Sequence, residues 1–149
     1  MATRGGLGVK VDPAAMGILA RDLRALPVRM QARVRRALAE AGVDLAGRIR
    51  SNASWSSRIP NAVSVSSIVI AGKDIRTTVT VDGAKAPEAA PLENQGRPGR
   101  FRRPVYGYRD RIVEQDAHPF IAPAVLASTE PTAKKVLDAI DQAAKDVHL

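Results

Sequence analysis

The apolar residues follow a helical period in two long stretches, one toward each end of the chain. In the first stretch, which begins after Pro27, the apolar positions are Val34, Leu38, Ala41, Leu45 and Ile49. In the second stretch they are Val136, Leu137, Ile140, Ala143, Ala144 and Val147. Intervals of three and four residues place these side chains on one face of a helix. The sequence therefore predicts a long amphipathic helix in each half of the chain. The second of them has two candidate starts, near Pro123 and near Thr129.

The region between the helices changes to a β pattern. Residues 62–82 are rich in Val, Ile and Thr, and Ile75, Thr77, Val79 and Val81 alternate with more polar residues. This period of two is typical of a strand with one buried face. Gly72-Lys73-Asp74 supplies a turn between two such strands, and residues 111–115 are a candidate third strand. We therefore predict an α+β fold, with a small antiparallel sheet packed against the long N-terminal and C-terminal helices.

The remaining segments are punctuated by glycine and proline. Residues 1–12 contain Gly5, Gly6 and Gly8 and predict a flexible arm. Residues 96–110 combine Gly and Pro with several Arg and predict an extended interaction loop, because such a composition cannot bury enough apolar surface to order itself. At 149 residues we expect one domain, 1–149.

Charge is unevenly distributed along the chain, whose formal net charge is +8. Residues 1–60 carry 11 basic and 4 acidic side chains, residues 96–112 carry 6 Arg and one Asp, and residues 113–149 carry 3 Lys and 6 acids. Two positive regions and a negative tail suit a surface for nucleic acid or charge-complementary contacts between copies. A solvated basic face is the plainer alternative.

Aromatic residues are concentrated in the window 101–125, which reads FRRPVYGYRDRIVEQDAHPFIAPAV. Phe101, Tyr106, Tyr108 and Phe120 lie within it, and Trp55 alone lies outside it, in a polar loop that we expect it to pin. Aromatic and Arg side chains are the usual anchors of protein interfaces. We therefore predict an interface at Phe101, Tyr106, Tyr108, Arg100, Arg102 and Arg103. Packing in a small core cluster is the alternative for all four rings of the window, and above all for Phe120.

The same residues permit a second interpretation, binding of nucleic acid without sequence preference. Arginines would contact phosphates while the rings stack on bases. Arg29, Arg33 and Arg36, which lie off the apolar face of the first helix, are candidate DNA-facing residues under either interpretation.

Residues for catalysis or metal binding are not grouped in the sequence. The chain has no Cys, and His118 and His148 stand apart from any second ligand at metal-binding spacing. Glu88, Glu93 and Glu114 are expected to be solvated carboxylates, and no nucleophile or phosphate-binding motif occurs. We predict a protein that is not an enzyme and needs no cofactor or metal. No apolar run has the length of a signal peptide or of a membrane span, so we expect a soluble protein with no membrane contact.

The order of these features resembles a known family. A basic N-terminal helix, a β-branched middle, the segment APLENQG, the motif HPFIAPAV (118–125) and a closing helix resemble the neck or tail-component family of long-tailed bacteriophages. The segment FRRPVYG resembles the form found in phages of actinobacteria, which commonly reads Arg-His-Pro-Val-Phe-Gly. This chain has Arg103 in place of that histidine and Tyr106 in place of that phenylalanine.

The resemblance implies a virion structural protein of the head-tail junction, either a tail completion or a tail terminator subunit. It implies a homo-oligomeric ring, six-fold by this resemblance, around the DNA channel. The partners would be neighbouring neck and tail proteins, with DNA in the lumen. The subunit would be synthesised in the host cytoplasm and located in the virion.

Overall fold

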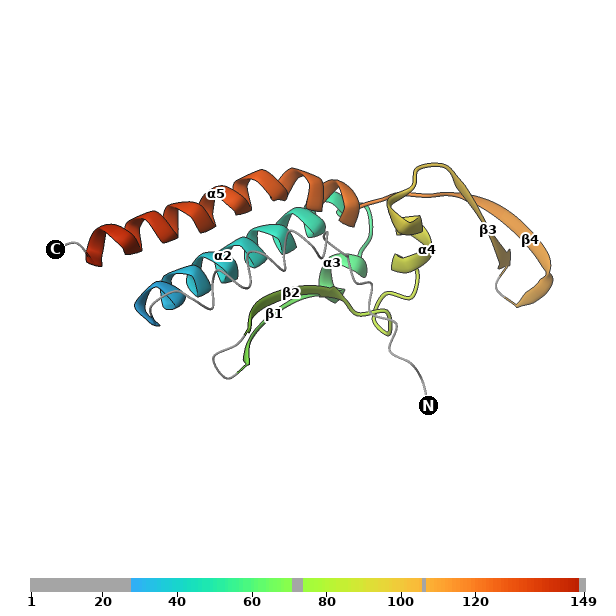
Figure 1. Cartoon of the computed structure of the whole chain (residues 1–149). Helices are drawn as coiled ribbons and strands as arrows, with labels where there is room; N and C mark the ends of the chain where they lie inside the picture. The colour runs from blue at the N-terminus through green and yellow to red at the C-terminus, as the bar shows by residue number, and fades with distance from the viewer. Residues whose placement is uncertain (1–27, 71–73, 106, 148–149) are drawn as a thin grey trace.

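The computed structural model describes residues 28–70, 74–105 and 107–147, and the predicted arm 1–12 lies outside them. The described chain mixes helices with two antiparallel hairpins, so the α+β prediction is confirmed (Figure 1). In chain order the elements are α2 (Val28–Asn52), α3 (Ile59–Ala62), β1 (Val63–Ile70), β2 (Asp74–Val81), α4 (Ala89–Glu93), η1 (Asn94–Gly96), β3 (Arg100–Val105), β4 (Tyr108–Asp116) and α5 (Ile121–Val147).

The two long helices lie side by side and run in opposite directions (Figure 1). Val34 of α2 and Val136 of α5 are buried together, with Leu38 and Ile140 packed around them. Two ion pairs, Arg33–Asp146 and Asp44–Lys135, also join α2 to α5. The apolar stripes predicted from the sequence therefore face each other.

The first hairpin, β1–β2, covers a different side of α2 (Figure 1). Val63 pairs with Val81 at one end of the ladder, and Ile70 pairs with Asp74 at the other. Gly42 of α2 makes this contact close, because a Cβ atom there would lie 2.2 Å from Cγ2 of Thr77. Helix α2 is thus the middle layer between α5 and the hairpin.

The second hairpin differs from the expected arrangement. The candidate third strand does form, as part of β4, but it pairs with β3 instead of joining β1 and β2. Most of the segment predicted as an extended loop is extended, and it is hydrogen-bonded as strand β3. β4 pairs with β3, the strand immediately before it in the chain. This pairing closes only a short loop, which costs less entropy than pairing with a distant strand.

Helix α5 is continuous where the sequence offered a second start. It runs from Ile121 to Val147 with Pro131 inside it. Proline lacks the N–H that would bond to the carbonyl of Ala127. Two residues earlier, the Thr129 hydroxyl donates to the Val125 carbonyl at 2.9 Å.

The main core lies where the end of α2, the short helices and the start of α5 converge. Its largest fully buried side chains include Phe120 and Ile59, and small residues such as Ala46, Ala53 and Ala86 fill the space between elements. Phe120 is fully buried, so the core-packing alternative holds for this ring. The β3–β4 hairpin extends from this end of the molecule, while the last turn of α5 lies at the other end (Figure 1).

Candidate interaction surface

A buried carboxylate, Glu93, holds the start of α5. Its side chain is 4% exposed, and Oε2 accepts the backbone N–H groups of Phe120 at 2.6 Å and Ile121 at 2.8 Å. Oε1 accepts the N–H of Ala122 at 2.9 Å. The first N–H groups of a helix have no partner within it, and the helix dipole favours a negative charge there. The prediction of a solvated carboxylate is wrong for Glu93, because these donors satisfy it inside the protein.

The turn that delivers Glu93 uses left-handed backbone. Asn94, Gln95 and Gly96 have φ values of 47°, 56° and 75°. A Cβ atom on Gly96 would lie 2.7 Å from Cβ of Ala122, so this turn fits closely against α5. The carbonyl of Leu92 accepts the N–H of His118 at 2.8 Å. The segments LENQG and HPFIA are therefore joined into one unit, the Glu93 junction.

Trp55 packs against the Glu93 junction through the rings of His118 and Phe120. Its Nε1 donates to the carbonyl of Asn52 at 3.0 Å, and its ring centroid lies 5.4 Å from His118 and 6.3 Å from Phe120. Asn52 in turn donates from Nδ2 to the carbonyl of Phe120 at 3.2 Å. Trp55 pins its loop, as the sequence predicted, and does so against the residues that begin α5.

The base of the β3–β4 hairpin packs on the main core, and ion pairs balance the charges of its arginines. Phe101 is half-buried and packs against the main core. Nε of Arg100 lies 2.9 Å from Oδ1 of Asp116, and Nε of Arg102 lies 3.6 Å from Oε1 of Glu114. These groups are exposed, and such pairs contribute at most about 1 kcal/mol each. Of the predicted interface residues, Phe101, Arg100 and Arg102 are thus engaged within the subunit.

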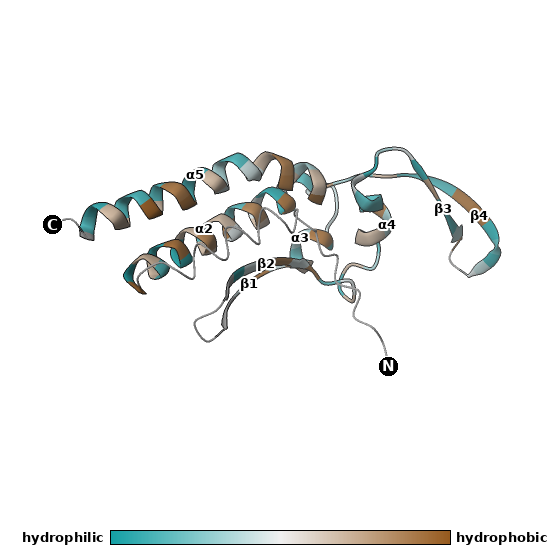
Figure 2. Ribbon diagram, viewed as in Figure 1, coloured by the Kyte–Doolittle hydropathy of each residue, from teal (hydrophilic) through white to brown (hydrophobic). Residues whose placement is uncertain are grey.

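The far part of the hairpin presents charge and apolar surface together. Arg103, Arg109 and Arg111 make no ion pair with any described residue, and Cζ of Arg111 lies 5.0 Å from the centre of the Tyr108 ring. Tyr108 is 55% exposed and Ile112 is 61% exposed. Figure 2 shows hydrophobic residues on β4 in this projecting hairpin. We call Arg103, Tyr108, Arg109, Arg111 and Ile112 the hairpin tip; Tyr106 lies outside the described residues.

The candidate DNA-facing arginines lie elsewhere, on α2. Arg29, Arg33 and Arg36 are exposed, and their spacing places them on one side of the helix. Arg33 is paired with Asp146, while Arg29 and Arg36 make no ion pair within the described ranges. The structure does not bring this group together with the hairpin tip, because α2 and the hairpin occupy different parts of the molecule (Figure 1).

The three glutamates considered for acid-base chemistry are also separate. Glu93 is engaged at α5, Glu114 lies beside the arginines of β3, and Glu88 precedes α4. Among the described residues, no group of three or more His, Asp or Glu side chains could hold a metal ion.

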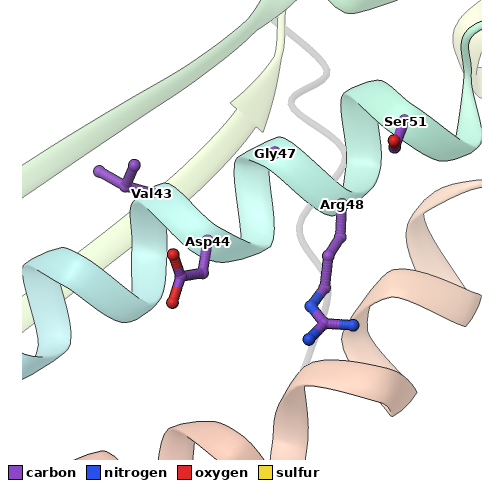
Figure 3. Close-up of a pocket in the computed structure, with 5 residues that line it drawn as sticks. All are labelled: Val43, Asp44, Gly47, Arg48 and Ser51. Carbon is purple, nitrogen blue, oxygen red and sulfur yellow. The ribbon is translucent and has the colours of Figure 1, made fainter.

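A shallow depression lies along α2, lined by Val43, Asp44, Gly47, Arg48 and Ser51 (Figure 3). All five residues come from this one helix. The side chains of Asp44 and Arg48 point toward α5, and Asp44 is already paired there with Lys135 (Figure 3). The depression is therefore open surface beside the helix pair, without converging groups from other elements.

No model of a protein family matches the chain, and neither a curated protein nor a solved structure matches it. None of the described helices combines the length and apolar character needed to cross a membrane.

The Glu93 junction is the main feature that the sequence analysis missed. Its partners are 27 to 29 residues away, beyond the reach of any local pattern. One signal was present, however. The long helix α5 follows the sequence Ala117-His118-Pro119-Phe120, which has no Ser, Thr, Asp or Asn in the N-cap position. The free N–H groups at a helix start without a local cap need hydrogen-bond acceptors from water or from elsewhere in the chain.

Proposed function

We propose that this protein is a virion structural subunit that assembles with copies of itself into a ring at the head-tail junction of a long-tailed bacteriophage. In this proposal it acts as a tail completion or tail terminator subunit. The observation that carries the proposal is the projecting β3–β4 hairpin, with its exposed Tyr108 and Ile112 and with three arginines of its tip that make no ion pair with a described residue.

The hairpin supports an assembly function because it is poorly covered by its own subunit. Isolated two-stranded hairpins are marginally stable in water. This one is tied to the body at Phe101 and lies open at Tyr108 and Ile112. Tyr and Arg are enriched at the energetically important positions of interfaces. A neighbouring subunit would cover the tip and stabilise it.

The head-tail junction is suggested by the resemblance of the segments LENQG and HPFIAPAV to the phage neck and tail-component family. The Glu93 junction gives these two segments one physical task, since Glu93 binds the N–H groups that open the helix after His118 and Pro119. The two segments are then expected to occur together, because the helix start in HPFIAPAV would lack its acceptor without Glu93, and Glu93 would lack its donors without that helix start.

The test is the mass of the full-length chain, measured by native mass spectrometry and by light scattering across a range of concentrations. A closed ring gives a discrete multiple of 15.9 kDa that stops growing as concentration rises. Particles of the phage that encodes the chain should contain the same multiple at the neck. A chain that stays monomeric at every concentration and is absent from particles would refute the proposal.

Binding of nucleic acid is the second candidate function. It is favoured by Arg29 and Arg36, which are exposed and make no ion pair with the part of the chain that the structure describes. Binding through phosphates weakens steeply with salt, with log K falling by about 0.9 per phosphate contact for each unit of log salt concentration. Duplex-DNA titrations at several salt concentrations therefore test this candidate. A steep slope for a chain that never self-associates would replace the ring proposal.

A further inference from the structure

Helix α5 carries a second apolar face that nothing in the described chain covers. Leu126 is 78% exposed and Leu137 is 64% exposed, and Ala133 between them is exposed as well. With Glu130 these residues follow the spacing i, i+4, i+7, i+11, so they form one line along the helix. We call Leu126, Glu130, Ala133 and Leu137 the α5 outer stripe. It lies away from the face that packs on α2 through Val136.

The charge beside this stripe is mainly acidic. Glu130 and Asp138 are exposed and make no ion pair with a described residue, whereas Asp141 binds Nζ of Lys145 at 2.9 Å. The hydrogen bond and the charge of Asp141 raise the pKa of Lys145 above its ordinary value. Lys145 therefore stays positively charged, and Asp141 balances that charge on the same helix. This leaves Lys134 as the cation beside Glu130 and Asp138 on this side of the described helix.

The hairpin is suited to contact through its tip and faces, because the edge formed by β3 is protected against strand addition. Pro104 in β3 has no N–H to offer to another strand, and the strand is dense in charge. Ile112 lies opposite Pro104 in the ladder, so these two present a small apolar surface near the tip. Arg109 and Arg111 lie beside it on β4.

We propose that the hairpin tip of one copy docks on the α5 outer stripe of the next copy. This inference rests on the proposed assembly function and names the two surfaces that would meet. Tyr108 and Ile112 would pack on Leu126 and Leu137, while Arg109 and Arg111 would face Glu130 and Asp138.

Opposite charges favour this contact over the symmetric ones. Two hairpin tips would bring Arg109 and Arg111 of both copies together, and two α5 stripes would bring Glu130 and Asp138 together, and like charges at an interface are costly. The two surfaces lie on different elements, α5 and the β3–β4 hairpin, so the contact is head to tail and leaves a free surface for another copy (Figure 1). Such a contact closes into a ring when its rotation is a full turn divided by a whole number and includes no shift along the axis.

Charge reversal on each surface tests the contact in the full-length chain. One variant carries Arg109→Glu with Arg111→Glu, and a second carries Glu130→Lys with Asp138→Lys. Each variant alone then has like charges on both of its surfaces, and we expect its self-association to weaken at least about tenfold. Mixed together, the two variants again present opposite charges at every contact. We expect the mixture to assemble with affinity close to that of the original chain, and only into alternating, even-numbered rings.

The matched control carries Arg29→Glu with Arg36→Glu. It changes the net charge by the same amount as the hairpin variant, on exposed arginines of α2, and should assemble as the original chain does. Assembly of either reversed variant at the original affinity, or no recovery on mixing, would overturn the inference while leaving the ring proposal standing. A monomeric original chain would overturn both. If the hairpin variant lost only its retention on duplex DNA, the tip would be a nucleic-acid surface and the inference would fall.

The absence of cysteine from the sequence allows an independent measurement. Ile112→Cys combined with Leu137→Cys should give a ladder of covalent oligomers with a short bismaleimide, ending at the closed ring. Ile112→Cys combined with Val43→Cys, where Val43 is 60% exposed on α2, is the matched pair and should not. Equal ladders from both pairs would contradict docking on α5.

Discussion

Replacing Glu93 should be far more damaging than replacing any exposed glutamate, because its carboxylate accepts three backbone N–H groups at 2.6, 2.8 and 2.9 Å. Glu93→Gln keeps the shape of the side chain and removes the charge. If its oxygen takes the position of Oε2, its NH₂ group faces the N–H of Ala122, donor against donor. Glu93→Ala leaves all three donors without a partner.

The magnitude follows from the number and type of bonds. A hydrogen bond to a charged group contributes about 1.5–3 kcal/mol, and a charge at a helix terminus up to about 2 kcal/mol in a partly buried site. Losing the charge and one bond therefore predicts about 1.5–5 kcal/mol for Glu93→Gln. Losing three such bonds predicts about 4.5–9 kcal/mol for Glu93→Ala, comparable to the whole stability of a small domain, about 5–15 kcal/mol.

Urea unfolding measures this change, followed by the fluorescence of Trp55, the one tryptophan of the chain. Its ring lies 6.3 Å from that of Phe120, so it reports on the same junction. Hydrogen exchange adds a local measurement, since the amides of Phe120, Ile121 and Ala122 should lose protection first in Glu93→Gln. The control is Glu40→Gln, an exposed glutamate on α2, with an expected change within about 0.5 kcal/mol. Equal stability of the two glutamine variants would refute the capping role.

Two glycines provide the remaining predictions. Gly42→Ala should destabilise the chain by about 1–3 kcal/mol, because the new Cβ would lie 2.2 Å from the methyl group of Thr77. Adding Thr77→Ser removes that methyl group and should restore much of the lost stability. No recovery in the urea midpoint would contradict the close contact of α2 with β2. Gly96→Ala should lower the midpoint more than Gly107→Ala, because both have positive φ, 75° and 82°, but only the former places a Cβ within 2.7 Å of Ala122. Equal midpoints would show that the positive φ alone accounts for the loss of stability at Gly96, without a contribution from the contact with Ala122.

Local patterns predicted the separate elements well, because their causes are local. The spacing of Val34 and Leu38 marked the buried face of α2, and the alternation from Ile75 to Val81 marked strand β2. The aromatic and arginine-rich window was also visible as a region apart. The sequence did not show which of its rings would be buried and which exposed: Phe101 packs on the core, whereas Tyr108 is 55% exposed.

What the sequence alone determined is the two long helices, the strands β1 and β2 and the α+β class, since helical and strand periods depend on residues a few positions apart. The tertiary structure decided which strands pair, that β3 and β4 form their own projecting hairpin, and that Glu93 caps a helix beginning 28 residues later at Ile121. These outcomes depend on how distant segments are brought together in space. A carboxylate looks the same in a sequence whether water or three backbone N–H groups will surround it.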